Sequence, residues 1–114
     1  MARVIKRGEI WIVNLEPGSY RKIHKKRPAL VISSQIVNEE TAHTIIIPVS
    51  SQTPHVLGVE MISIGKKEGL TKSSVLLPLF IRSIDQELLV KKIGAVSEEV
   101  LAHVEEVLKV LLSL

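Results

Sequence analysis

Arg27 is the first candidate for a functional residue, because the residues that follow it restrict its backbone and could orient its side chain. Pro28 follows it and restricts the backbone of Arg27 to extended conformations, just before an apolar run. An arginine held in this way can direct its planar guanidinium at one phosphate and bind it through two parallel hydrogen bonds. Taken alone, the residues favour a more ordinary role, a surface ion pair at the edge of a strand.

Three further side chains are candidates for catalysis. Ser50 ends the apolar run 44–50 and supplies a hydroxyl donor, and Ser51 offers the same group one residue later. A polar turn at the end of a strand is the competing interpretation of both serines. His24 lies among lysines and arginines, where a neutral imidazole could act as a general base. A histidine that is simply solvated is the alternative there.

Composition and charge narrow the class of protein. The 114 residues carry a net charge of +3 and no cysteine, which excludes disulfides and thiolate metal sites. The histidines lack metal-ligand spacing, so we expect no metal and no cofactor. The N-terminus is not a signal peptide and no apolar run is long enough to span a bilayer, so we expect one cytoplasmic domain over 1–114.

Five of the cationic residues lie close together in one stretch, namely Arg21, Lys22, Lys25, Lys26 and Arg27. Phosphate or an acidic partner is the natural ligand of such a stretch.

The hydrophobic pattern predicts many short strands and one terminal helix. Alternating or unbroken apolar runs indicate strands at 9–15, 29–33, 44–50, 56–64, 74–81 and 90–96, with one helical turn at 85–88. Pro78 favours an edge or a bulge in the fifth strand. Ser97 is a suitable N-cap, and apolar residues then recur at helical spacing as far as Leu112. We therefore expect a mainly β fold with a C-terminal helix, either a strongly bent antiparallel sheet or a partly open barrel.

Four motifs follow one another along most of the chain. They are Arg7-Gly8-Glu9-Ile10-Trp11, Arg27-Pro28-Ala29-Leu30-Val31, Ile45-Ile46-Ile47-Pro48-Val49-Ser50-Ser51 and Ile81-Arg82-Ser83-Ile84-Asp85. With these motifs in this order, the chain resembles the MazF/PemK family, the endoribonuclease toxins of bacterial toxin–antitoxin systems. The resemblance implies the SH3-like small barrel of the MazF/CcdB group and a homodimer.

The resemblance also implies a function and roles for residues. It implies a metal-independent, sequence-specific endoribonuclease that cleaves single-stranded RNA and is neutralised by an antitoxin protein. In that family the arginine at the position of Arg27 binds the scissile phosphate. The hydroxyl at the position of Ser50, usually a threonine, stabilises the transition state. Arg82 is then expected near the substrate groove, and the cations Arg21, Lys22, Lys25 and Lys26 are expected to bind RNA.

Two departures from the family pattern keep other functions open. Leu79-Phe80 stands where many members carry an acid and a glutamine, and the stretch before Arg27 lacks the usual E-Q-x-G. One alternative is a CcdB-like toxin that binds gyrase and cuts nothing. Another is a catalytically weak relative that binds RNA or an antitoxin. For the last motif, an Arg82–Asp85 pair that fixes the backbone is the structural alternative.

Overall fold

The structure, a computed structural model, describes residues 3–15, 26–54 and 56–114. Its elements in chain order are β1 (Glu9–Asn14), β2 (Lys26–Val31), α1 (Gln35–Glu40), β3 (His43–Ser50), β4 (Ile62–Ile64), η1 (Lys66–Glu68), β5 (Ser74–Leu76), η2 (Pro78–Phe80), β6 (Arg82–Asp85), η3 (Gln86–Leu88), β7 (Leu89–Ala95) and α2 (Glu98–Leu112), where η marks a short 3₁₀ helix.

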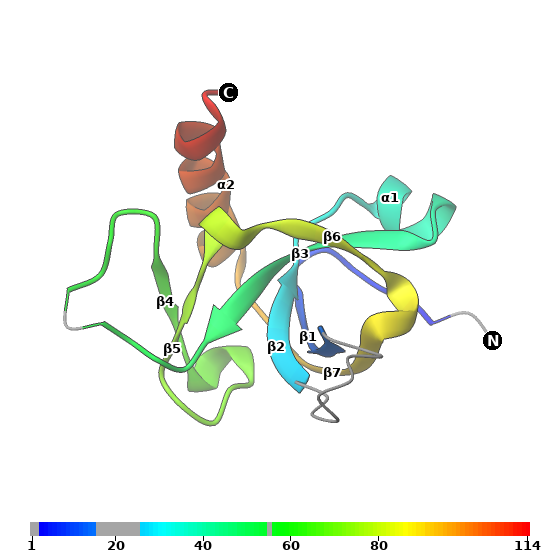
Figure 1. Cartoon of the computed structure of the whole chain (residues 1–114), viewed down its shortest axis with the longest axis horizontal. Helices are drawn as coiled ribbons and strands as arrows, with labels where there is room; N and C mark the ends of the chain where they lie inside the picture. The colour runs from blue at the N-terminus through cyan, green and yellow to red at the C-terminus, as the bar shows by residue number, and fades with distance from the viewer. Residues whose placement is uncertain (1–2, 16–25, 55) are drawn as a thin grey trace.

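The strands form one strongly curled antiparallel sheet in the order β4-β5-β3-β2-β1-β7, and β6 pairs with β3 as well. The long strand β3 serves two parts of the sheet, because His43–Ile46 pairs with β6 while Val49 and Ser50 pair with β5. Figure 1 shows β1, β2, β3, β6 and β7 curling around a common interior, with α2 outside the curl. A mainly β fold with a C-terminal helix is therefore confirmed, in the form of a half-barrel.

Hydrophobic side chains fill both faces of the central strands. One cluster, which we call the outer cluster, joins Ile10, Leu30 and Ile47 to Val104 and Val107 of α2. The other, the inner cluster, lies within the curl and contains Ile5, Trp11, Val13, Ala29, Val31, Ile46, Ile84 and Leu89. Because successive residues of a strand face opposite sides, each central strand contributes to both clusters. This explains why the runs at 29–33 and 44–50, which became β2 and β3, are unbroken.

The terminal helix is confirmed almost to the residue. Ser97 is its N-cap, and the Ser97 hydroxyl accepts a hydrogen bond of 3.2 Å from the backbone N–H of Val100. Val104 and Val107 are buried against the sheet, as the helical spacing predicts.

Two of the predicted strands are wrong in extent. Of the run 56–64 only Ile62–Ile64 is a strand. Val56 and Val59 before it are 83% and 93% exposed, so apolar side chains there find no sheet face to bury. The run 74–81 is a strand only as far as Leu76, and η2 then begins at Pro78, whose fixed φ and missing N–H suit the first position of a helix.

The strand β6 and the helix α1 were not predicted, nor was the short 3₁₀ helix η1. The strand β6 is mostly exposed, and only Ile84 of its four residues is buried, so its sequence lacks a strand-like apolar pattern. The helix α1 is a short helix of six residues capped by Ser34. By contrast, the helical turn expected at 85–88 is present as η3.

Candidate functional site

Arg27 lies near the start of β2, opposite Val13 of β1. It has the same parity along β2 as Ala29 and Val31, which belong to the inner cluster, so all three lie on the inner face of the sheet. The Arg27 side chain is exposed. Among the described residues no carboxylate forms an ion pair with it.

Ser50 reaches the same end of the sheet from β3. The last pair of the β2–β3 ladder is Ala29 with Pro48, and Arg27 and Ser50 each lie two residues beyond it. Since side chains two residues apart share a face, both lie on the inner face at this end. Ser50 is half-buried and its Oγ accepts a 3.1 Å hydrogen bond from the N–H of Gln52, and its own O–H donates to no group in the described ranges. Ser51 follows the strand and is exposed.

Arg82 joins them from β6. It pairs with Ile46 of β3, which in turn pairs with Val31 of β2, so the three residues form one row across three strands. Ile46 and Val31 both belong to the inner cluster, and Arg82 therefore lies on the inner face, where it is exposed. The tertiary structure thus brings two arginines and one hydroxyl to one face from three strands.

Other predicted site residues are not part of this group. Lys26 is exposed and pairs with Asn14, one residue before Arg27, so it lies on the opposite face. Four candidates fall outside the described residues: Arg21, Lys22, His24 and Lys25.

The Arg82–Asp85 pair, the structural alternative for the last motif, does not form among the described residues. Asp85 lies three positions after Arg82 in β6, an odd spacing, so their side chains face opposite sides of the strand. Asp85 instead pairs with His43, whose Nε2 lies 3.1 Å from the carboxylate. The two residues are direct partners in the β3–β6 ladder, which accounts for the contact. Sequence spacing carried no signal of this long-range pairing.

Glu9 is the buried carboxylate of the first motif, only 7% exposed. Its Oε1 accepts hydrogen bonds from the N–H of Lys6 at 2.8 Å and the indole N–H of Trp11 at 3.0 Å, and its Oε2 lies 3.0 Å from the Lys92 ammonium. Burial raises the pKa of Glu9, but these hydrogen bonds and the Lys92 charge outweigh it and hold the pKa below its usual value. An ionised carboxylate with three donors is a structural anchor and a poor proton acceptor.

The described residues also set limits on metal and membrane binding. No three histidine, aspartate or glutamate side chains among them are grouped as metal ligands. None of the helices in the described ranges has the length and apolar character that crossing a bilayer requires.

Comparisons with known proteins agree with this architecture. Residues 6–112 match the family described as PemK-like, MazF-like toxin of type II toxin–antitoxin system. The chain is 32% identical over 116 residues to Endoribonuclease MazF9 of Mycobacterium tuberculosis, which covers 97% of this chain and 98% of that protein.

Two solved structures show the same fold. MazF from Deinococcus radiodurans (Form-I) superposes with a TM-score of 0.81 at 25% identity, over 99% of this chain and 100% of that one. An endoribonuclease in complex with its cognate antitoxin, from a mycobacterial species, has a TM-score of 0.78 at 19% identity, over 97% of each chain.

Proposed function

Because this chain belongs to the family of PemK-like, MazF-like toxins of type II toxin–antitoxin systems, we propose that it cleaves single-stranded RNA at a short recognition sequence without a metal ion. It is a MazF-like endoribonuclease toxin that an antitoxin neutralises. The observation that carries the finer proposal is the shared position of Arg27 and Ser50 on the inner face, at one end of the β2–β3 pair.

The proposed mechanism uses the nucleophile that RNA itself supplies. The ribose 2′-hydroxyl attacks the adjacent phosphorus, and the bond to the 5′-oxygen of the next nucleotide breaks. The Arg27 guanidinium donates hydrogen bonds to the phosphoryl oxygens, where negative charge develops in the transition state. The Ser50 O–H donates a further bond, and Arg82 binds a neighbouring phosphate. A base takes the proton of the 2′-hydroxyl and the leaving 5′-oxygen takes up a proton, so the products are a 2′,3′-cyclic phosphate and a 5′-hydroxyl.

Two described side chains are unsuited to accept the proton of the 2′-hydroxyl. Glu9 is ionised, buried and already bonded to three donors. His43 is at the far end of β3, seven residues from Ser50, which is roughly 23 Å along an extended strand. His24 therefore stays the candidate base for the 2′-hydroxyl, and Ser51 stays the alternative to Ser50 as the hydroxyl donor.

The two alternative functions, a CcdB-like toxin that binds gyrase and a catalytically weak relative that binds RNA or an antitoxin, have less support. The family match lies with the PemK-like and MazF-like toxins, which favours a nuclease over a gyrase-binding protein of the CcdB type. The alternative that the chain is a catalytically weak relative is based on Leu79 and Phe80. They stand in η2 at the positions where many family members carry an acid and a glutamine, so no carboxylate is present there. A cleavage assay separates this alternative from the active enzyme.

We also propose that the toxin acts in the cytoplasm as a homodimer. Leu79 and Phe80 are neighbours on η2, and their side chains are 60% and 62% exposed in the single chain. Adjacent large apolar side chains in solvent are typical of a surface that another protein covers.

The decisive experiment is cleavage of a mixed-sequence RNA in the presence of EDTA by the parent, Arg27→Ala and Arg27→Lys. Removing a preorganised donor to developing charge costs on the order of 100-fold or more in rate, so we expect Arg27→Ala to be nearly inactive. Arg27→Lys keeps the charge but not the two-pronged donor, and should recover only part of the rate. Circular dichroism checks that each variant is folded. A folded Arg27→Ala that cuts at the parent rate would rule out the mechanism.

A further inference from the structure

Ser50 rests on a rigid part of the sheet. Its backbone forms the end pair of the β3–β5 ladder, with Val75 as the partner. Val49, Val75 and Leu76 in this ladder are 3% exposed or less, so the backbone beneath Ser50 belongs to the packed core. Strand pairing therefore fixes the Cα and Cβ atoms of Ser50 and leaves only the torsions of its side chain to be set.

The chain that follows β3 sets these torsions. The Ser50 side chain has three staggered rotamers, and its O–H also turns about the Cβ–Oγ bond. The backbone N–H of Gln52 donates a 3.1 Å hydrogen bond to Ser50 Oγ, which closes a turn over residues 50–52. Because Oγ meets this N–H only in a rotamer that directs it along the chain, the bond restricts the side chain. It also occupies one lone pair of Oγ.

The O–H of Ser50 is the group that is left to act on a ligand. Within the described ranges it donates to no other group. Ser50 shares the inner face with Arg27, and each lies two residues beyond the pair of Ala29 with Pro48. A hydroxyl that accepts one hydrogen bond is a stronger donor of another, because linked hydrogen bonds polarise one another. The Gln52 N–H thus orients and strengthens a donor on the face that carries Arg27.

Ser51, the alternative hydroxyl, lacks this support. It follows the last residue of β3, its side chain is exposed, and no hydrogen bond in the described ranges restricts its hydroxyl. A mobile side chain loses conformational entropy when it is ordered on a ligand, which costs free energy. The Ser50 hydroxyl is ordered beforehand, so the two neighbouring serines differ in preorganisation, and this difference comes from Gln52.

We propose that the backbone N–H of Gln52 is a positioning group of the active site, which orients the Ser50 hydroxyl toward the scissile phosphate. The proposal rests on the proposed function for the reaction. The N–H acts through Ser50 and contacts no substrate atom. Since its hydrogen bond exists before RNA binds, the donor does not have to be reoriented as charge develops on the phosphoryl oxygens. The same bond assigns the donor role to Ser50 and not to Ser51.

The test compares Gln52→Pro with Gln52→Ala. Both variants lose the glutamine side chain, and only proline lacks the N–H, so the difference between them measures the N–H itself. At saturating RNA we expect the single-turnover rate of Gln52→Pro to be about tenfold below that of Gln52→Ala, the effect of one hydrogen bond. Their affinities for an RNA with a 2′-deoxynucleotide at the cleavage site, which cannot be cut, should be alike. Equal rates for the two variants would overturn the proposal.

A second comparison separates positioning from a general effect of proline on the turn. The same two substitutions are made in Ser50→Ala, where there is no hydroxyl to orient, and they should then cleave at equal rates. A tenfold difference that persists in Ser50→Ala would show that proline acts through the turn, which would overturn the positioning role. Circular dichroism checks that all variants are folded.

The hydrogen bond is also tested without RNA. Amide hydrogen exchange of Gln52, followed by NMR, should become faster in Ser50→Ala because the N–H loses its acceptor. Ser51→Ala removes the hydroxyl one residue further on and should leave this protection in place. Unchanged exchange in Ser50→Ala would overturn the proposal whatever the cleavage assay gives. A parent that cuts no RNA would instead contradict the proposed function.

Discussion

The hydroxyl of Ser50 has one clear expected role, donation to the phosphoryl group. We expect Ser50→Ala to slow cleavage, because the variant loses the O–H donor at the end of β3. Ser50→Thr keeps the hydroxyl and should cleave at least as fast as the parent. Single-turnover rates on one RNA, with Ser51→Ala as the matched control, measure both effects. If Ser50→Ala is fully active and Ser51→Ala is slow, the role belongs to Ser51.

Glu9 makes stability depend on pH. Its folded-state pKa is below the ordinary value of 4.5, so its contribution is present above that value and disappears as the pH falls through the folded-state pKa. We expect Glu9→Gln to lower the free energy of unfolding at pH 7 by about 2 kcal/mol, because Lys92 loses its charged partner. Urea unfolding at pH 7 and pH 3 should show a smaller difference at pH 3. Glu87→Gln, at an exposed site, is the control, and an equal difference at both pH values would contradict this assignment.

The segment that joins β1 to β2 is expected to act through charge. Lys22, Lys25 and Lys26 lie in or beside it, and Lys26 is exposed at the start of β2. The segment has few groups suited to reading base edges, so we expect phosphate contacts. Neutralising all three lysines should weaken RNA binding and flatten its salt dependence by roughly 0.7 log–log units per lost contact. The preferred cleavage sequence should stay unchanged, and a new preference would show that the segment reads bases.

For the molecule as a whole, the proposed dimer depends on η2. Sedimentation at micromolar concentration should give about twice the monomer mass of 12.6 kDa. Leu79→Glu places a charge in the exposed apolar pair and should shift the protein toward monomer. Ile36→Glu introduces the same charge at a 73% exposed position on α1 and should leave the dimer intact. A parent that sediments as a monomer would contradict the homodimer, and a dimeric Leu79→Glu would move the interface elsewhere.

The sequence by itself determined the elements whose signals are local. The Ser97 cap and the helical spacing up to Leu112 predicted α2, because a helix closes its hydrogen bonds within a few residues of the chain. The apolar runs likewise located β1, β2 and β3, although β2 begins at Lys26, before the run itself. The motifs around Arg27 and Ser50 identified candidate site residues, whose roles stay predictions.

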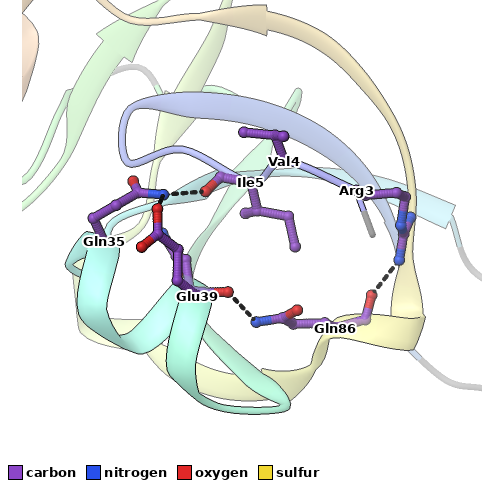
Figure 2. A pocket seen from close by; sticks show the side chains of 7 residues that line it. Arg3, Val4, Ile5, Gln35, Glu39 and Gln86 are labelled. Atoms are coloured by element: carbon purple, nitrogen blue, oxygen red, sulfur yellow. Dashed lines mark hydrogen bonds between the residues drawn. The ribbon is translucent and has the colours of Figure 1, made fainter. Parts of the chain in front are cut away.

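Only the tertiary structure decided which of these residues meet. Arg27, Ser50 and Arg82 share a face because of the register of β2 with β3 and of β3 with β6. Strand pairing depends on partners far away in the chain, and β6 itself was invisible in the sequence because only Ile84 is buried. The same holds for the 56–61 run, which is apolar without being a strand, and for a pocket beside α1, whose walls come from the N-terminal segment, from α1 and from η3 (Figure 2). The shared face of the site residues, the strand β6 and the exposure of the 56–61 run all depend on contacts between segments that are distant in the sequence. No local pattern of residues encodes such contacts.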